Sequence, residues 1–169
     1  MFLRAFVEIR VPASAAARVL RRLPQALVES FAEEAIDHGH TVLAEVGVPL
    51  GKGSSSEQGE STIRCRLGKQ VQIELGDAVE VPSRTWLPVT WKPTSAGTFF
   101  PALEGELEVA PLGRDVTQIG LSARYKPPFG VLGTTLDRMF LHRVAEATVQ
   151  DFVQRVAAAI QSQSRVTSS

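Results

Sequence analysis

Hydrophobic and polar residues alternate with a period of two along much of the chain, which is typical of strands with one buried face. Between Thr98 and Ala110, for example, Leu103, Leu107 and Val109 alternate with glutamates. An antiparallel sheet of the first strand plus five or six more is expected. The predicted strands are Ala5 to Val11, Thr41 to Val46, Glu60 to Leu67, Gln70 to Leu75, Val79 to Trp91, Thr98 to Ala110 and Val116 to Tyr125.

Two short helices are expected between the first two of these strands. Ser14 can cap a helix from Ala15 to Leu23, and Pro24 suits the first turn of a helix from Gln25 to Ile36. The polar stretch Asp37 to His40 then predicts a turn.

Two other segments interrupt the strand pattern. Val48 to Gly59 holds three glycines and three consecutive serines, so it predicts a loop. Pro82 and Pro88 make Val79 to Trp91 irregular, which indicates an edge strand or a bulge.

A long helix is expected near the C-terminus. Pro127 and Pro128 cannot continue a strand, and the residues after them are good helix formers. The helix is therefore predicted to begin near Phe129 or Gly130 and to reach Ile160, and the polar residues 162–169 are expected to form a disordered tail.

The apolar stripe of this helix changes side near Leu141. The second half places Ala145, Val149, Phe152, Val153, Val156 and Ile160 on one face. In the first half that face carries Val131, Thr134, Thr135, Arg138 and His142, while Leu132, Leu136, Met139, Phe140 and Val144 point the other way. Three interpretations stay open: a break near Leu141, a continuous helix that turns polar groups towards a cavity, or packing of the first half on a partner.

Composition and charge limit the classes of protein to which this chain can belong. The chain has 169 residues, 44% of them hydrophobic, which fits a single globular domain over residues 1–161. Its net charge is zero, so no basic field favours nucleic acid. Cys65 is the only cysteine, and neither a secretory signal nor a long apolar segment is visible, so we expect a cytoplasmic protein without an internal disulfide or a membrane span.

The order of elements predicts an α+β domain. An antiparallel sheet with one apolar face needs a cover, and the three helices are the elements that can provide it. A curved sheet on a long helix tends to leave space between the two, and this space is the candidate site.

The chain resembles uncharacterised bacterial members of the START-like, or SRPBCC, superfamily, which includes polyketide cyclases. The resemblance rests on Phe100 to Gly113, Tyr125 to Gly133, Asp137-Arg138 and His142 to Ala145. It implies a helix-grip fold, in which a curved antiparallel sheet wraps around a long C-terminal helix and an apolar cavity lies between the two. The polyketide cyclases have no universal catalytic motif that can be placed on this sequence residue by residue.

Candidate site residues are mostly aromatic or apolar, because such side chains line sites for hydrophobic ligands. They are Trp86, Trp91, Phe99, Phe100, Leu103, Leu121, Tyr125, Phe129, Leu136 and Phe140. Tyr125, Arg138 and His142 are the candidates for acid–base or anchoring work. No metal site and no cofactor are expected, since His38, His40 and Cys65 lack a further Cys/His pair.

Three functions follow from this pattern. The first is binding or transport of a small hydrophobic molecule, such as a lipid or a polyketide-like compound, without catalysis. The second is an enzyme of the cyclase or aromatase type. The third is an interaction module with a filled core that docks through Leu132, Leu136 and Phe140, and a homodimer is one form that this would take.

Overall fold

The computed structural model describes residues 2–45, 71–93, 102–126 and 138–166. In chain order the elements are β1 (Phe2–Ile9), α1 (Ala13–Leu20), α2 (Gln25–Glu45), β2 (Val71–Leu75), β3 (Val79–Val81), β4 (Arg84–Pro93), β5 (Ala102–Pro111), β6 (Thr117–Lys126) and α3 (Arg138–Val166).

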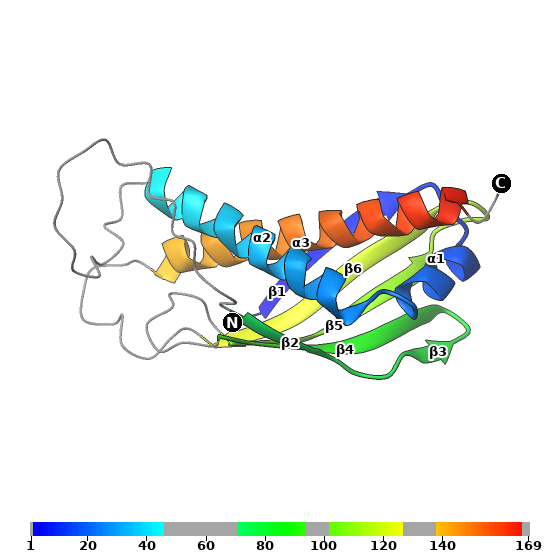
Figure 1. The fold of residues 1–169 in the computed structure, drawn as a ribbon, viewed down its shortest axis with the longest axis horizontal. Coiled ribbons are helices and arrows are strands. Elements are labelled where there is room, and N and C mark those ends of the chain that lie inside the picture. Colours follow the sequence, from blue (N-terminus) through cyan, green and yellow to red (C-terminus); the bar gives the residue numbers. More distant parts are fainter. Residues whose placement is uncertain (1, 46–70, 94–101, 127–137, 167–169) are drawn as a thin grey trace, which may run out of the picture.

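The strands form one antiparallel sheet. Its order is β1-β6-β5-β4-β2, and the short β3 pairs with β4. The predicted alternation is confirmed in β6, where Thr117, Ile119, Leu121, Ala123 and Tyr125 are all buried on the inner face. The helices lie over this face, with α2 and α3 side by side along it (Figure 1).

Helix α3 supplies the largest part of the cover. Val149, Phe152, Val153, Val156 and Ile160 are buried against the sheet, which confirms the predicted apolar face. The helix runs without interruption from Arg138 past residue 141, so of the three interpretations a break at Leu141 is excluded, and the expected start near Phe129 lies outside the described residues. It also continues to Val166, so residues 162–166 are helical rather than part of a disordered tail.

Helix α2 is much longer than predicted. It continues through the expected turn at residues 37–40 and through the expected strand from Thr41, and it ends at Glu45. The expected turn contains one glycine, Gly39, and a glycine inside a helix costs only about 1 kcal/mol relative to alanine. Burial of Ala32, Ala35 and Ile36 in the common core holds the preceding turns in place, and the helix propagates from them.

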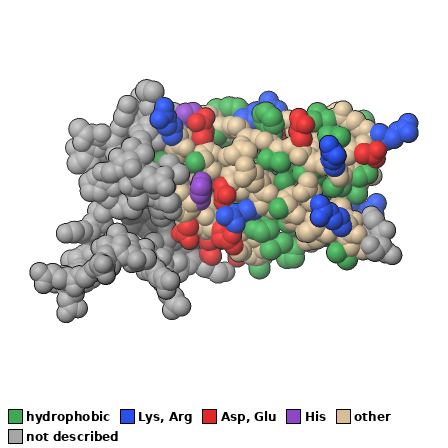
Figure 2. Space-filling view, turned by 90° about the horizontal axis from the view of Figure 1, so that it is seen from above, with side chains coloured by type: hydrophobic (Ala, Val, Ile, Leu, Met, Phe, Trp, Pro, Cys, Tyr) green, Lys and Arg blue, Asp and Glu red, His purple; other side chains and the backbone are tan. Residues whose placement is uncertain are grey.

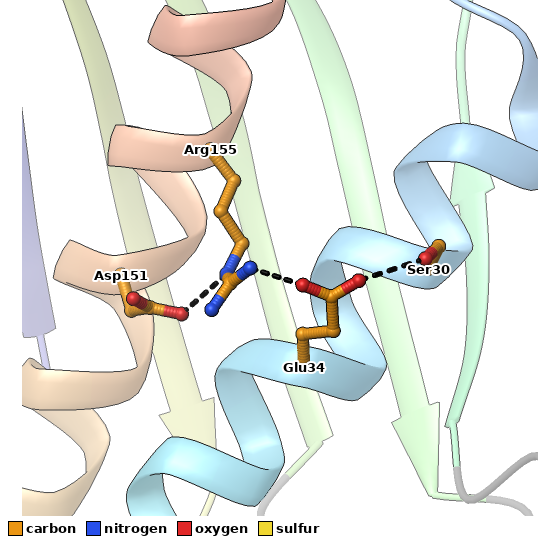
Figure 3. Close-up of polar contacts among 4 residues, drawn as sticks. All are labelled: Ser30, Glu34, Asp151 and Arg155. Carbon is orange, nitrogen blue, oxygen red and sulfur yellow. Dashed lines mark hydrogen bonds and ion pairs between the residues drawn. The ribbon is translucent and has the colours of Figure 1, made fainter.

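A polar network joins α2 to α3 on the outside of the helical layer (Figure 3). Arg155 on α3 forms an ion pair with Glu34 on α2, and its Nε donates to Asp151 Oδ2 at 2.6 Å. The hydroxyl of Ser30 in turn donates to Glu34 at 3.2 Å. The pKa of Arg155 is raised, mainly by the hydrogen bond to Asp151, so the guanidinium stays charged.

Other boundaries differ in smaller ways. Helix α1 starts at Ala13, directly after Pro12, and no side chain caps it, so Ser14 is not the cap. The irregular stretch expected over residues 79–91 consists of the two strands β3 and β4. The predicted strand over residues 60–67 and the loop over residues 48–59 lie outside the described residues.

In the part of the chain that the structure describes, the architecture is α+β, with an open antiparallel sheet, three helices, and α3 packed on the sheet in the helix-grip manner. Side chains of both charge signs are spread over the helical face (Figure 2). Among the residues that the structure describes, no helix is both long enough and apolar enough to cross a membrane.

Candidate ligand-binding site

A row of three large side chains crosses the sheet near one end. Trp91 on β4 faces Leu103 on β5, and Leu103 faces Tyr125 on β6. All three are buried on the inner face. The pairing register brings them together, because residues directly opposite in antiparallel strands point to the same face of the sheet.

A cavity of about 20 Å³ lies between this row and α3. This volume has room for about one water molecule, whereas sites for small-molecule ligands usually measure several hundred Å³. Its lining is almost entirely apolar. The lining residues are Leu3, Trp91, Leu103, Tyr125, Ala145, Thr148 and Val149.

The helical side of the cavity is made of small side chains. Thr148 is the polar one among them, and its hydroxyl donates to the carbonyl of Val144 at 2.9 Å. One turn further on, Phe152 packs on Trp91 with 5.7 Å between the ring centroids. The sheet–helix interface is therefore filled at Phe152 and less tightly filled at Ala145 and Thr148.

A histidine and a tyrosine lie stacked beside the cavity. The rings of Tyr125 and His142 are 6.3 Å apart between centroids and inclined by 19°. His142 Nε2 lies 3.3 Å from Glu146 Oε1, and Nδ1 is buried without a hydrogen-bond partner among the described residues. An imidazole that donates from Nε2 to a carboxylate presents Nδ1 as an acceptor.

Tyr125 keeps its proton at neutral pH. Burial raises the pKa of its phenol, and the negative charge of Glu146 raises that pKa further. Tyr125 can therefore donate a hydrogen bond or act as an acid, but it is a poor base. Of the three candidates for acid–base or anchoring work, Tyr125 and His142 are brought together, and the side chain of Arg138 lies outside the described residues.

Trp86 does not face the cavity, contrary to the sequence prediction. It lies on β4 an odd number of residues from Trp91, so the two side chains point to opposite faces of the sheet. On the outer face the guanidinium of Arg84 lies 5.8 Å from the Trp86 ring centre. Counting the period along this strand would have separated the two tryptophans.

The remaining predicted lining residues have different positions. Leu121 is fully buried further along β6 and is not part of the cavity wall. Phe99, Phe100, Phe129 and Leu136 lie outside the described residues, as does the side chain of Phe140. The proposed docking face of Leu132, Leu136 and Phe140 is outside them too.

Sequence reasoning missed four residues of the wall. Leu3 lies before the predicted strand, which begins at Ala5, although the alternation extends back to it. Ala145 and Val149 were expected on the buried helical face but not as cavity residues. Thr148 follows Ala145 by three residues and precedes Phe152 by four, which is the signal that places it on the same face.

Among the side chains that the structure describes, no group of three or more His, Cys, Asp or Glu residues is placed so that it could hold a metal ion.

Fold and site together define an α+β helix-grip protein with a small apolar cavity under its C-terminal helix. No protein-family model matches the sequence, and comparison with curated proteins finds no match. Among solved structures, a conserved protein from Geobacillus kaustophilus aligns with a TM-score of 0.55 and 14% identity, covering 96% of this chain and 97% of that one. The Zhui aromatase/cyclase from Streptomyces sp. R1128 aligns with a TM-score of 0.44 and 16% identity, covering 100% and 96%. At these identities the likeness concerns the fold alone.

Proposed function

We propose that the protein binds a small hydrophobic molecule at the Tyr125 end of the interface between the sheet and α3. The supporting observation is the cavity under α3, whose wall is apolar apart from Thr148 and the phenol of Tyr125. An apolar group that enters such a space leaves water without giving up hydrogen bonds.

Binding requires the wall to open. A volume of about 20 Å³ is smaller than a short alkyl chain, so the ligand must push side chains apart or extend the cavity towards the end of the sheet. Ala145 and Thr148 are small and line the cavity, whereas the larger Phe152 packs directly on Trp91. The first half of α3 is therefore the part expected to move on binding.

The polar groups beside the cavity favour a ligand with one hydrogen-bond donor. His142 Nδ1 is a buried nitrogen without a hydrogen-bond partner among the described residues, and in the tautomer with the proton on Nε2 a ligand hydroxyl or amide N–H would satisfy it. The proposed ligand class is thus a molecule with an apolar body and a single hydroxyl or amide head.

The two tryptophans allow a direct test. Trp86→Phe leaves Trp91, in the cavity wall, as the single tryptophan, and Trp91→Phe leaves Trp86 on the outer face as the matched control. Titration with 1-decanol is expected to change the emission of the Trp86→Phe variant and to leave that of the Trp91→Phe variant unchanged. Equal responses, or none in either variant, would reject binding at this site.

Native mass spectrometry of the purified protein complements the titration. A released hydrophobic compound at near one-to-one ratio would support the proposal and give the chemical class of the ligand.

A second candidate is an enzyme of the cyclase or aromatase type. The stacked Tyr125 and His142 favour it, because a neutral phenol and an imidazole acceptor can act as acid and base on one substrate. Turnover of a polyketide-like substrate that is lost in both Tyr125→Phe and His142→Phe would favour this candidate over simple binding.

A further inference from the structure

Strand β1 forms one edge of the sheet. Among the described residues it pairs with β6 on one side and with no strand on the other. Such an edge presents a row of unpaired backbone N–H and C=O groups, which can add a strand from another chain. On the outer face this edge also exposes two large apolar side chains, Phe2 at 60% and Phe6 at 55%.

Space is available beside this edge. A surface groove of about 370 Å³ lies between β1 and α3. Leu3, Arg4 and Ala5 line it from the strand, and Arg143, Glu146 and Gln150 are among the residues that line it from the helix. The helix therefore leaves room at the edge for the side chains of an added strand.

We propose that β1 pairs antiparallel with β1 of a second copy of this chain, so that two sheets join across a two-fold axis at Phe6. In this register Phe6 faces the partner's Phe6, and Arg4 faces the partner's Glu8. By symmetry, Glu8 faces the partner's Arg4, so the interface gains two ion pairs around one aromatic pair.

The sequence of β1 selects this register. On the inner face Leu3 meets the partner's Ile9, and Ala5 meets the partner's Val7, so apolar groups meet apolar groups. A slip of two residues in one direction places Arg4 opposite the partner's Phe6, and in the other direction opposite the partner's Arg10. Opposite charges therefore face each other in the proposed register and not in its nearest alternatives.

Arg4 changes its ion-pair partner when the two copies pair, because its present partner Glu108 lies on β5, on the side of β1 away from the free edge. Its guanidinium lies 3.5 Å from Glu108 Oε1 on the outer face of the sheet, and its side chain is still 59% exposed. Glu8 is exposed on the same face of the strand. The proposal concerns this edge only and does not depend on what the cavity binds.

Charge reversal tests the pairing. Sedimentation velocity over a concentration series is expected to show a dimer for the unchanged protein. Glu8→Arg should weaken it by about tenfold or more, since two attractive cross-strand pairs become repulsive. The double variant Arg4→Glu/Glu8→Arg should restore the dimer, and Arg124→Glu, on the same face of neighbouring β6, should leave it unchanged.

A disulfide tests the register. In a Cys65→Ser background, Phe6→Cys places the two thiols at the two-fold axis, where mild oxidation should link them. Phe2→Cys is the matched control, because its copies lie about 27 Å apart in this register at about 3.4 Å per residue, and it should not form a link. A folded monomer at every concentration, or a dimer that is insensitive to Glu8→Arg and forms no link through Phe6→Cys, would overturn the proposal.

Discussion

The imidazole of His142 on α3 lies almost parallel to the phenol ring of Tyr125 on β6, with 6.3 Å between the ring centroids and 19° between the planes. One turn further along α3, the carboxylate of Glu146 lies 3.3 Å from His142 Nε2. Burial raises the pKa of Tyr125, and the charge of Glu146 raises that pKa further. The contact between His142 and Glu146 turns Nε2 towards the carboxylate, and under the proposed function Nδ1 is the atom that would accept a hydrogen bond from the ligand.

Replacement of His142 tests that acceptor. His142→Phe keeps an aromatic ring next to Tyr125 and removes Nδ1, so affinity for 1-decanol should fall about five- to tenfold, as for the loss of one hydrogen bond. Decyl methyl ether, which has no donor, should bind the variant and the unchanged protein equally well. Isothermal titration calorimetry measures both, and equal losses for the two compounds would show that His142 contributes packing alone.

Tyr125 is the only tyrosine in the chain, so its ionisation can be measured without overlap. Its raised pKa predicts that the near-ultraviolet tyrosinate band appears only above the ordinary value of 10.0. Burial favours the neutral phenol in the folded state. The contribution of Tyr125 to the free energy of unfolding is therefore complete below about pH 10 and is lost as the pH rises through the folded-state pKa.

Unfolding in urea at several alkaline pH values checks the same link. The free energy of unfolding should fall with pH above about 10, and Tyr125→Phe should make that fall less steep. A titration midpoint at or below 10 would contradict the prediction.

Phe152 is expected to be among the most important core side chains. It is fully buried and packs on Trp91, so Phe152→Ala should cost about 3–5 kcal/mol of unfolding free energy through lost burial and the cavity left behind. Leu112→Ala is the control, because Leu112 is half exposed at the turn between β5 and β6 and should cost less than about 0.5 kcal/mol. Urea denaturation of both variants gives the comparison.

Two glycines should respond oppositely to the same substitution. A Cβ at Gly105 would lie 2.6 Å from the carbonyl oxygen of Ser122 and 2.7 Å from Ala123 Cβ, so Gly105→Ala should destabilise the sheet by about 1–3 kcal/mol. A Cβ at Gly113 meets nothing within 4 Å. Gly113→Ala should be neutral or should stabilise the fold by up to about 1 kcal/mol, because it restricts the unfolded chain. Thermal unfolding of the pair measures the difference.

The ion pair between Arg155 and Glu34 should contribute little to stability. Both side chains are partly in solvent, so Arg155→Met should cost about 1 kcal/mol or less, and the cost should shrink further at high salt. Glu34→Gln is the matched change on α2. A loss of several kcal/mol in either variant would show that the network fixes the packing of α2 on α3.

The local pattern of the sequence determined which face of each main element is buried. Alternation assigned Leu103, Leu107 and Val109 to the inside of β5, and helical spacing assigned Phe152 and Val156 to the inside of α3. These assignments need only neighbours in the sequence, since the side-chain period of a strand or helix is fixed by backbone geometry.

Only the tertiary structure decided which of these buried side chains meet. Trp91, Leu103 and Tyr125 come together through the register of three strands, and Trp86 faces away from them on the same strand as Trp91. The continuation of α2 through the expected turn likewise accompanies its packing on α3. Registers and helix contacts join residues far apart in the chain, and one sequence specifies them only through the shape and volume of the whole core.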